Sequence, residues 1–276
     1  MREKTRIKDL QSFVSQSVSE DGLLIEVVTN LLLLSGAPSG ATANDGVHPF
    51  SASVVVGKLD EGFYSRFLRA TSARSPVVVA SEGGSAEVAL KVAEVIKERR
   101  PEIVIMGICV SACAEILLPA AQTYAKSLIL RDALIGFHHN SAIARQLYLD
   151  GKRRDFGHCY GALDAKFQQF RARTSMKYDA FRKQMSILRP KLVEGDGATA
   201  CRQVRIVSEV KFWFPNSKQL SEDFGLRPVT GVCVDNSDCV ARLLRMVAKN
   251  AEHYVIGDTE YSVQLDAGKF SLKPVS

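Results

Sequence analysis

The sequence predicts an α/β fold built on parallel β-strands. Short apolar runs such as Val77–Ala80 are rich in β-branched residues and lack polar alternation, which is typical of strands buried on both faces. These runs alternate with segments whose apolar residues recur at helical spacing, such as residues 85–99. Because strands and helices alternate along the chain, we expect a parallel sheet covered by helices.

The expected elements follow one another between residues 51 and 137. Asp60 is expected to cap the first helix, and a turn at residues 81–84 is expected to precede the second. The third helix is expected to begin at Ala112, directly after a strand. The expected strands are 51–59, 77–80, 103–106, 127–130 and 133–137, and the expected helices are 60–71, 85–99 and 112–124.

The chain changes character after residue 141. Residues 143–190 are polar and rich in Arg, Lys and Gln, and they predict one long helix, or two, inserted in the domain. This insertion is expected either to reach away from the core or to pack against a partner subunit. The later expected elements are a short strand within 204–213, a helix at 215–224 stopped by Gly225, a strand at 229–234, a helix at 238–249 and an edge strand in the tail.

Three parts make up the predicted domain organisation: an N-terminal helical extension and linker (1–50), the α/β domain (51–252) and a C-terminal tail (253–276). Residues 35–50 are rich in Gly, Ala, Ser and Pro, as linkers are. Before them, basic residues precede an apolar run at 23–34. This order is similar to a signal peptide, but Glu26 and Asn30 interrupt the run and favour an amphipathic helix. Cytoplasmic and periplasmic locations therefore both stay open.

Composition excludes few classes of function. The formal net charge is +6, but 36 basic residues interleave with 30 acidic ones, so we expect a mixed surface and no nucleic-acid partner. No apolar run reaches the ~18 to 20 residues that cross a bilayer. No glycine-rich nucleotide motif is present, so we do not expect nucleotide binding through such a motif. Cys233 and Cys239 bracket a turn, and they either pair across a hairpin or remain free thiols.

Three separate features suggest acyl-transfer chemistry. Ser111 stands at an expected strand-to-helix junction, His138 ends an expected strand, and Gly83 and Gly84 occupy another strand-to-helix turn. A serine needs a base such as histidine to take its proton, and the oxyanion needs backbone N–H donors, for which Ala112 is a further candidate. Each feature also has a structural interpretation: the serine as a helix cap, the glycines as a turn and the histidine as a packing residue.

The order and spacing of three segments carry a resemblance to a known family. These segments are SEGGSAEVALKVAEVI (81–96), MGICVSACAEILLPAA (106–121) and LIGFHHN (134–140). Together they resemble the Clp proteolytic subunit family and its relatives. Bacterial periplasmic-type Clp-like proteins share the C-x-S-A-C element, which here runs from Cys109 to Cys113. The resemblance covers residues 51–142 well and 205–232 loosely.

The resemblance implies a spiral of β-β-α units, shared with the crotonase superfamily, and a serine peptidase that acts on peptides or proteins without a cofactor. It also implies a homo-oligomer. Ser111 takes the nucleophile position, and His138, rather than His139, takes the position of the general base. Gly83, Gly84 and Ala112 take the oxyanion and substrate-binding positions.

This sequence departs from the family at the third catalytic residue. The family's acidic position falls near Phe212 and Trp213, where FWFPN holds no carboxylate. Glu209 is the nearest upstream candidate, and Asp196, Asp223 and Asn140 are others. A dyad without a third member is a further alternative.

Two other functions remain open at this point. A relative that keeps the fold as an oligomeric scaffold or binding module would need no acid. A crotonase-type acyl-thioester enzyme would use the same oxyanion turn to hold an enolate.

Overall fold

The computed structural model describes residues 52–72, 75–138, 161–178, 185–194, 204–226, 231–249, 251–266 and 269–275. The expected N-terminal extension lies outside these ranges, as do Asn140, His139 and Asp196. Within the described residues, no helix is both long and apolar enough to cross a membrane.

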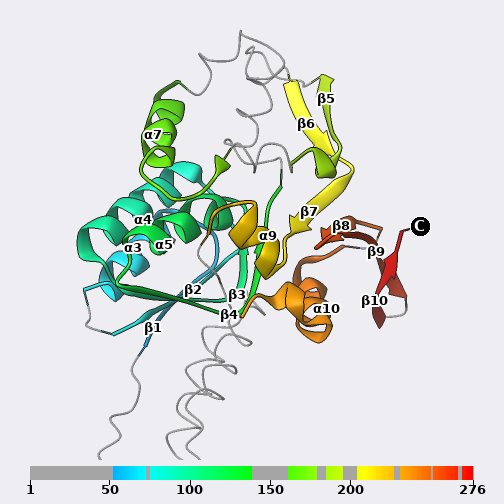
Figure 1. Ribbon diagram of the computed structural model, residues 1–276, viewed down its shortest axis with the longest axis horizontal. Coiled ribbons are helices and arrows are strands. Elements are labelled where there is room, and N and C mark those ends of the chain that lie inside the picture. Colours follow the sequence, from blue (N-terminus) through cyan, green and yellow to red (C-terminus); the bar gives the residue numbers. More distant parts are fainter. Residues whose placement is uncertain are drawn as a thin grey trace, which may run out of the picture.

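A four-stranded parallel sheet forms the first half of the molecule (Figure 1), which confirms the α/β expectation. Its strands lie in chain order, and each pairs with the next in parallel. They are β1 (Ser53–Val56), β2 (Val77–Ser81), β3 (Glu102–Val110) and β4 (Ser127–Gly136). All five residues of β2 are buried, as the absence of polar alternation predicted.

Three helical segments cover one face of this sheet. Helix α3 (Glu61–Ala70) begins at Asp60, whose carboxylate accepts the Phe63 N–H at 2.7 Å. Helix α4 (Ala86–Arg99) is capped by Ser85. The third segment starts as a π-helix, η1 (Cys113–Leu117), and continues as α5 (Leu118–Tyr124). The apolar faces of these helices form the larger hydrophobic core with the sheet residues that face them.

The two strands expected at 127–130 and 133–137 form the single strand β4. Asp132 joins them with a φ of 46°, and the register against β3 shifts at this point, where Gly107 follows Met106. A bulge of this kind lets a strand bend without ending its pairing. The ends of β3 and β4 therefore stay paired up to Val110 and Gly136.

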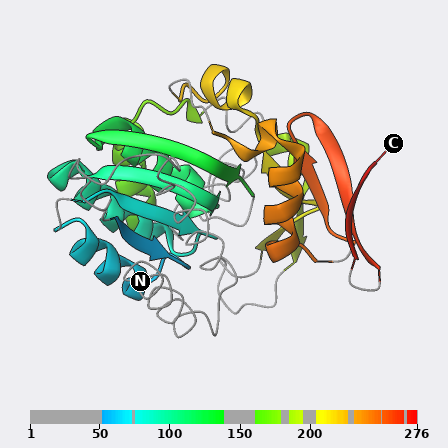
Figure 2. The ribbon, with the colours of Figure 1, turned by 90° about the horizontal axis from the view of Figure 1, so that it is seen from below.

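A second sheet lies on the side of the molecule away from α3 and α4, as both ribbon views show (Figures 1 and 2). Its strands are β7 (Val210–Phe214), β8 (His253–Ile256), β9 (Thr259–Asp266) and β10 (Lys269–Pro274). Helix α10 (Ser237–Val247) packs its apolar face between this sheet and β3 and β4, where Ile108, Val110 and Leu134 face it. The tail beyond residue 252, expected to hold an edge strand, thus supplies three strands.

Strand β7 also joins the two sheets. Trp213 pairs in parallel with Val255 of β8, and it exchanges two backbone hydrogen bonds of 2.9 Å with Phe137, just after β4. The short helix α9 (Ser217–Glu222) follows β7, as expected, and begins with a capping box formed by Asn216 and Gln219.

The stretch expected to be helical, 143–190, is only partly so where it is described. Helix α7 (Gly161–Arg171) is followed by an irregular segment and by the 3-10 turn η3 (Met185–Leu188). Strands β5 (Pro190–Glu194) and β6 (Val204–Ser208) then form an antiparallel pair. Residues 139–160 lie outside the described ranges.

The strand expected at 229–234 is not found among the described residues of that stretch. Val232 forms only an isolated bridge to Ala133, and the 3-10 turn η4 (Cys233–Asp235) follows it. Asn236 then caps α10, so the chain turns into a helix too early for a strand to extend. Cys233 and Cys239 are joined by a disulfide, but across this helix start and not across a hairpin.

Candidate active site

Ser111 lies in the turn between β3 and η1. Its φ of 57° is a left-handed conformation that costs a non-glycine residue about 1 to 3 kcal/mol. Two backbone hydrogen bonds of 2.9 Å hold it there, one from the Ser111 N–H to the Gly136 carbonyl and one from the Glu115 N–H to the Ser111 carbonyl. Strained residues of this kind gather at active sites, where neighbouring structure maintains them.

The hydroxyl of Ser111 does not cap the helix. Ala112 is the N-cap residue of η1, and no side chain accepts a hydrogen bond there. Within the described residues the Ser111 hydroxyl makes no hydrogen bond, although the side chain is only 6% exposed. Ser85, by contrast, caps α4 by accepting the Val88 N–H at 3.3 Å. The structural interpretation of Ser111 as a cap is therefore not supported.

A disulfide brackets Ser111. It joins Cys109, the last residue but one of strand β3, to Cys113, the first residue of η1, and both cysteines are fully buried. The two Cα atoms are 5.2 Å apart. This bond was not foreseen from the sequence. The spacing of the two cysteines is compatible with a disulfide only if the chain reverses between them, and that reversal is the turn at Ser111.

Gly83 packs directly against Ser111. A Cβ added to Gly83 would lie 2.4 Å from the Ser111 Cβ and 2.7 Å from the Val110 carbonyl oxygen, so only glycine fits. Gly83 also has a φ of 89°, which glycine adopts without strain. The structure thus brings the glycine turn after β2 and the serine turn after β3 into contact.

The backbone N–H groups near Ser111 differ in their availability. The Gly83 N–H donates to the Ser81 hydroxyl at 3.1 Å, and the Gly83 carbonyl accepts the Leu59 N–H at 2.8 Å. The N–H groups of Gly84 and Ala112 have no acceptor among the described residues. Of the three expected donors, Gly84 and Ala112 are therefore the two whose N–H groups are not already bonded within the described part of the chain.

His138 lies at the same edge of the sheet as Ser111. Val110 pairs with Gly136, so Ser111 comes one residue after its strand and His138 two residues after its own. The imidazole is partly buried, and its ring centroid lies 4.8 Å from that of Phe212 on β7. Phe212 is near the position where the family resemblance implies an acid. The expected position is thus adjacent to the histidine, but an aromatic ring occupies it.

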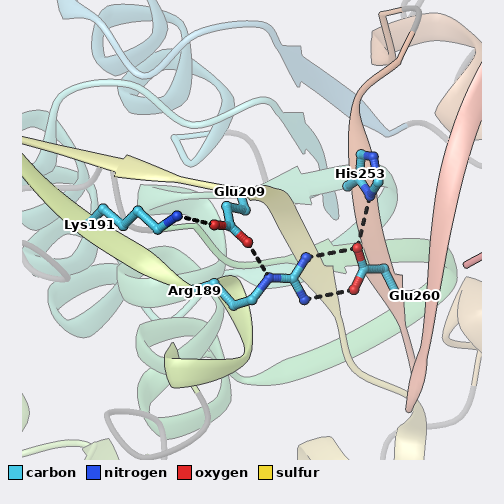
Figure 3. A network of polar contacts seen from close by, with 5 residues as sticks. All are labelled: Arg189, Lys191, Glu209, His253 and Glu260. Carbon is cyan, nitrogen blue, oxygen red and sulfur yellow. Dashed lines mark hydrogen bonds and ion pairs between the residues drawn. The ribbon is translucent and has the colours of Figure 1, made fainter.

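Glu209, the upstream candidate for the third member, belongs to a different group of contacts (Figure 3). Its carboxylate accepts a hydrogen bond of 2.6 Å from the Arg189 guanidinium and a second bond from Lys191. These two cations, Lys191 first, hold the pKa of Glu209 below its usual value. Asp223 ends α9 as its C-cap residue. The contacts of these two residues within the described part of the chain do not include His138, and the role of Glu209 stays a prediction.

Arg189 connects Glu209 to a second carboxylate, on β9. Its two terminal nitrogens donate to the two oxygens of Glu260 at 2.8 Å each, and Glu260 also contacts the His253 imidazole at 2.8 Å. The hydrogen bonds from Arg189 are the largest cause that lowers the pKa of Glu260, to about 2; burial opposes them, and the His253 contact adds a smaller lowering effect. This network links the segment around β5 and β6 to β8 and β9.

The helical segment behind Ser111 is supported by the segment that follows α7. The Tyr178 hydroxyl donates to the Glu115 carbonyl of η1 at 2.9 Å, and both residues are buried. Burial raises the pKa of Tyr178 well above its usual value, so this hydroxyl keeps its proton. A π-helix is less regular than an α-helix and is frequent at functional sites.

Sequence reasoning missed three residues of this site: Cys109 and Cys113 as a disulfide, and Tyr178 as a support of η1. The repeated cysteine around a serine was a visible signal for the first two. No signal in the sequence indicated that Tyr178 reaches Glu115, because 63 residues separate them.

Comparison with known proteins shows a distant likeness of fold. No protein-family model matches the chain, and no curated protein matches it in sequence. A ClpP1 variant from Listeria monocytogenes is 14% identical with a TM-score of 0.33, and the match covers 68% of this chain and 94% of that one. A variant of the 1510-N membrane-bound stomatin-specific protease, in complex with a substrate peptide, is 14% identical with a TM-score of 0.25. That match covers 31% of this chain and 42% of the protease, so this chain spans less than half of its length. Both likenesses concern the fold alone.

Proposed function

We propose that this protein is a serine hydrolase that cleaves peptide bonds, with Ser111 as nucleophile and His138 as general base. The observation that carries the proposal is the conformation of Ser111. Ser111 lies at a strand-to-helix turn in a strained conformation, and its hydroxyl does not cap the helix. The N–H of the next residue has no acceptor within the described residues, and the glycine turn packs against the serine. The same placement of a serine on a sharp turn after a strand exposes the nucleophile in unrelated hydrolases.

Each residue has a defined step in this mechanism. His138 takes the proton of the Ser111 hydroxyl as Oγ attacks the substrate carbonyl carbon. The carbonyl oxygen becomes an oxyanion, which accepts hydrogen bonds from the N–H groups of Ala112 and Gly84. His138 then gives the proton to the leaving amine. Water attacks the acyl-enzyme by the same route and frees the serine.

The glycine turn has two contributions in this proposal. Gly83 permits the close approach to Ser111, and Gly84 supplies the donor. The Gly83 N–H becomes a donor only if it leaves the Ser81 hydroxyl. The β-β-α spiral, the homo-oligomer and a peptide or protein substrate complete the proposal, since the three sequence segments that resemble Clp proteolytic subunits imply them together.

Covalent labelling tests the nucleophile. A fluorophosphonate forms a bond from phosphorus to the serine oxygen and releases fluoride, so it marks only activated serines. We expect labelling of the wild-type peptide that contains residues 107–118, and none in Ser111→Ala. Ser85→Ala, which removes the capping serine of α4 two residues after Gly83, serves as the control and is expected to keep the label. Equal labelling of wild type and Ser111→Ala would exclude Ser111 as the nucleophile.

A non-catalytic binding module is the second candidate. The observation that favours it is the Phe212 ring, which occupies the neighbourhood of His138 where the resemblance implies an acid. Losing an orienting carboxylate can lower turnover by ~10⁴-fold. Under this candidate, the protein forms stable oligomers, hydrolyses neither casein nor short peptides, and leaves every serine unlabelled by the fluorophosphonate.

A further inference from the structure

We infer that the Cys109–Cys113 disulfide is a positioning device that holds Ser111 in its left-handed conformation, and that oxidation of these two thiols completes the site. Only the catalytic effect of this positioning rests on the proposed function. The effect on the backbone of residues 109–113 does not depend on the proposed function.

The disulfide requires the turn. In an extended strand, residues four apart are separated by about 13 Å. The Cα atoms of Cys109 and Cys113 are 5.2 Å apart, so the chain must reverse between them. The reversal is made where Ser111 adopts its φ of 57°. The covalent ring therefore excludes the extended conformations into which a strained serine would otherwise relax.

The disulfide is also joined to the rest of the site through β2. Cys109 pairs in register with Ser81, and the Ser81 hydroxyl accepts the Gly83 N–H. Gly83 in turn packs on Ser111. Both ends of the serine turn are thus fixed: one by the sheet through Cys109, and the other by η1 through Cys113.

Formation of the bond has a defined chemistry. The two thiols lose two protons and two electrons to an external disulfide-carrying oxidant, which is reduced to two thiols. Both cysteines are fully buried in the folded chain, so the exchange takes place before the turn closes. The turn is therefore completed only where such an oxidant is present, as in oxidising compartments.

Hydrogen exchange tests the backbone claim in the full chain. The amides to follow are those of Ser111 and Glu115, whose hydrogen bonds define the turn. In the Cys109→Ala/Cys113→Ala pair we expect both to exchange about 30-fold faster, the effect of opening a ring of five residues. The matched control is Cys233→Ala/Cys239→Ala, which opens a ring of similar size outside the site and so loses a similar amount of global stability. It leaves local opening of the serine turn unaltered, so we expect the two amides, which exchange through that local opening, to keep their wild-type rates.

A rescue variant separates positioning from general loss of stability. Glycine adopts positive φ without a penalty, so Ser111→Gly in the Cys109→Ala/Cys113→Ala background is expected to slow the exchange of the Glu115 amide by about 5- to 10-fold. Loss of stability unrelated to the turn predicts no such recovery. If the alanine pair does not fold, Cys109→Val/Cys113→Ala restores most of the lost volume and is measured in its place.

The outcomes for the two proposals are distinct. If the two amides are equally protected in the Cys109→Ala/Cys113→Ala pair and in the control pair, the positioning role is overturned, whatever the labelling result. Absence of fluorophosphonate labelling in the wild type overturns the proposed function, while the exchange data still decide the positioning role. If both hold, the alanine pair is expected to label at least 10-fold more slowly than the control pair, because a misplaced nucleophile loses rate steeply.

Discussion

At the scale of single residues, the site depends on how closely backbones approach one another. Gly83 contacts both the side chain of Ser111 and the carbonyl of Val110, and a methyl group there would overlap with both. Ser111 in turn has a conformation that favours glycine. The chemistry needs the hydroxyl of Ser111, and the contact with Ser111 needs position 83 to have no side chain.

Adding a methyl group tests this contact. We expect Gly83→Ala to destabilise the fold by about 2 to 3 kcal/mol through overlap and to lower fluorophosphonate labelling by ~100-fold or more. Gly57→Ala is the matched control, because Gly57 also has positive φ, at 107°, but its added Cβ would meet no atom closer than 3.8 Å. It should cost only about 1 kcal/mol, from backbone strain. Similar unfolding midpoints for the two variants would contradict the contact.

Phe212 offers a second test at this scale. A carboxylate beside His138 favours the protonated imidazole and raises the pKa of that histidine. We therefore expect Phe212→Asp to shift the pH midpoint of Ser111 labelling upward and to increase the rate above that midpoint. Phe212→Asn, which has the same shape without the charge, should leave the midpoint where it is. A pH profile that is identical in the two variants would argue against a base at His138.

At the scale of elements, the helix that follows Ser111 depends on support from outside the first half of the chain. Tyr178 donates to a carbonyl of η1 from a segment that the sequence did not connect to it. A buried carbonyl that loses its donor costs about 1 to 3 kcal/mol.

Removing single hydroxyls measures this support. Tyr178→Phe is expected to lower the free energy of unfolding by at least 1 kcal/mol, as measured by denaturant titration. Tyr124→Phe removes a comparable bond, from the Tyr124 hydroxyl to the Arg173 carbonyl at 3.1 Å, but at the surface. Its effect should stay within about 0.5 kcal/mol. The reverse order would show that Tyr178 does not support η1.

The elements that the sequence predicted best are those specified by local patterns. Asp60 caps its helix as expected, because a cap needs only its neighbours along the chain. The strand expected at 229–234 was wrong, since Asn236 starts a helix that the apolar pattern alone did not reveal. At the candidate site, the serine turn and the glycine turn lie against each other, while the roles of their residues stay predictions. The disulfide, the Tyr178 contact and the ion pairs of Glu209 depend on the folded chain and were not predicted.

At the scale of the whole molecule, the network around Arg189 joins segments that are distant in sequence. Arg189 reaches Glu209 before β7 and Glu260 on β9, 71 residues away. Because folding lowers the pKa of Glu260 to about 2, the ionised carboxylate is favoured in the folded state. This contribution is present above the unfolded pKa of about 4.3 and is lost as the pH falls towards 2.

Acid titration of stability measures the network. Between pH 5 and pH 2 we expect the wild type to lose about 1 to 2 kcal/mol more than Glu260→Gln, a figure reduced for solvent screening. Glu222→Gln is the control, because the Glu222 carboxylate lies 4.0 Å from Lys218, four residues away on the same helix, and its replacement leaves the Arg189 network intact. It should follow the wild-type curve. Parallel curves for wild type and Glu260→Gln would show that the Arg189 pair contributes nothing measurable.

The position of β7 between the two sheets has a consequence for the order in which the protein is made. Ser111 and the two cysteines that flank it leave the ribosome early, but Phe212, which packs on His138, is added about 100 residues later. At ~5 to 20 residues per second, this delay lasts about 5 to 20 seconds. The indole of Trp213 then bonds to the Gly257 carbonyl, a further 44 residues along, at 3.1 Å. In a nascent chain the residues of the serine turn are therefore present well before Phe212 can pack against His138. Assembly of the site is a late event in synthesis.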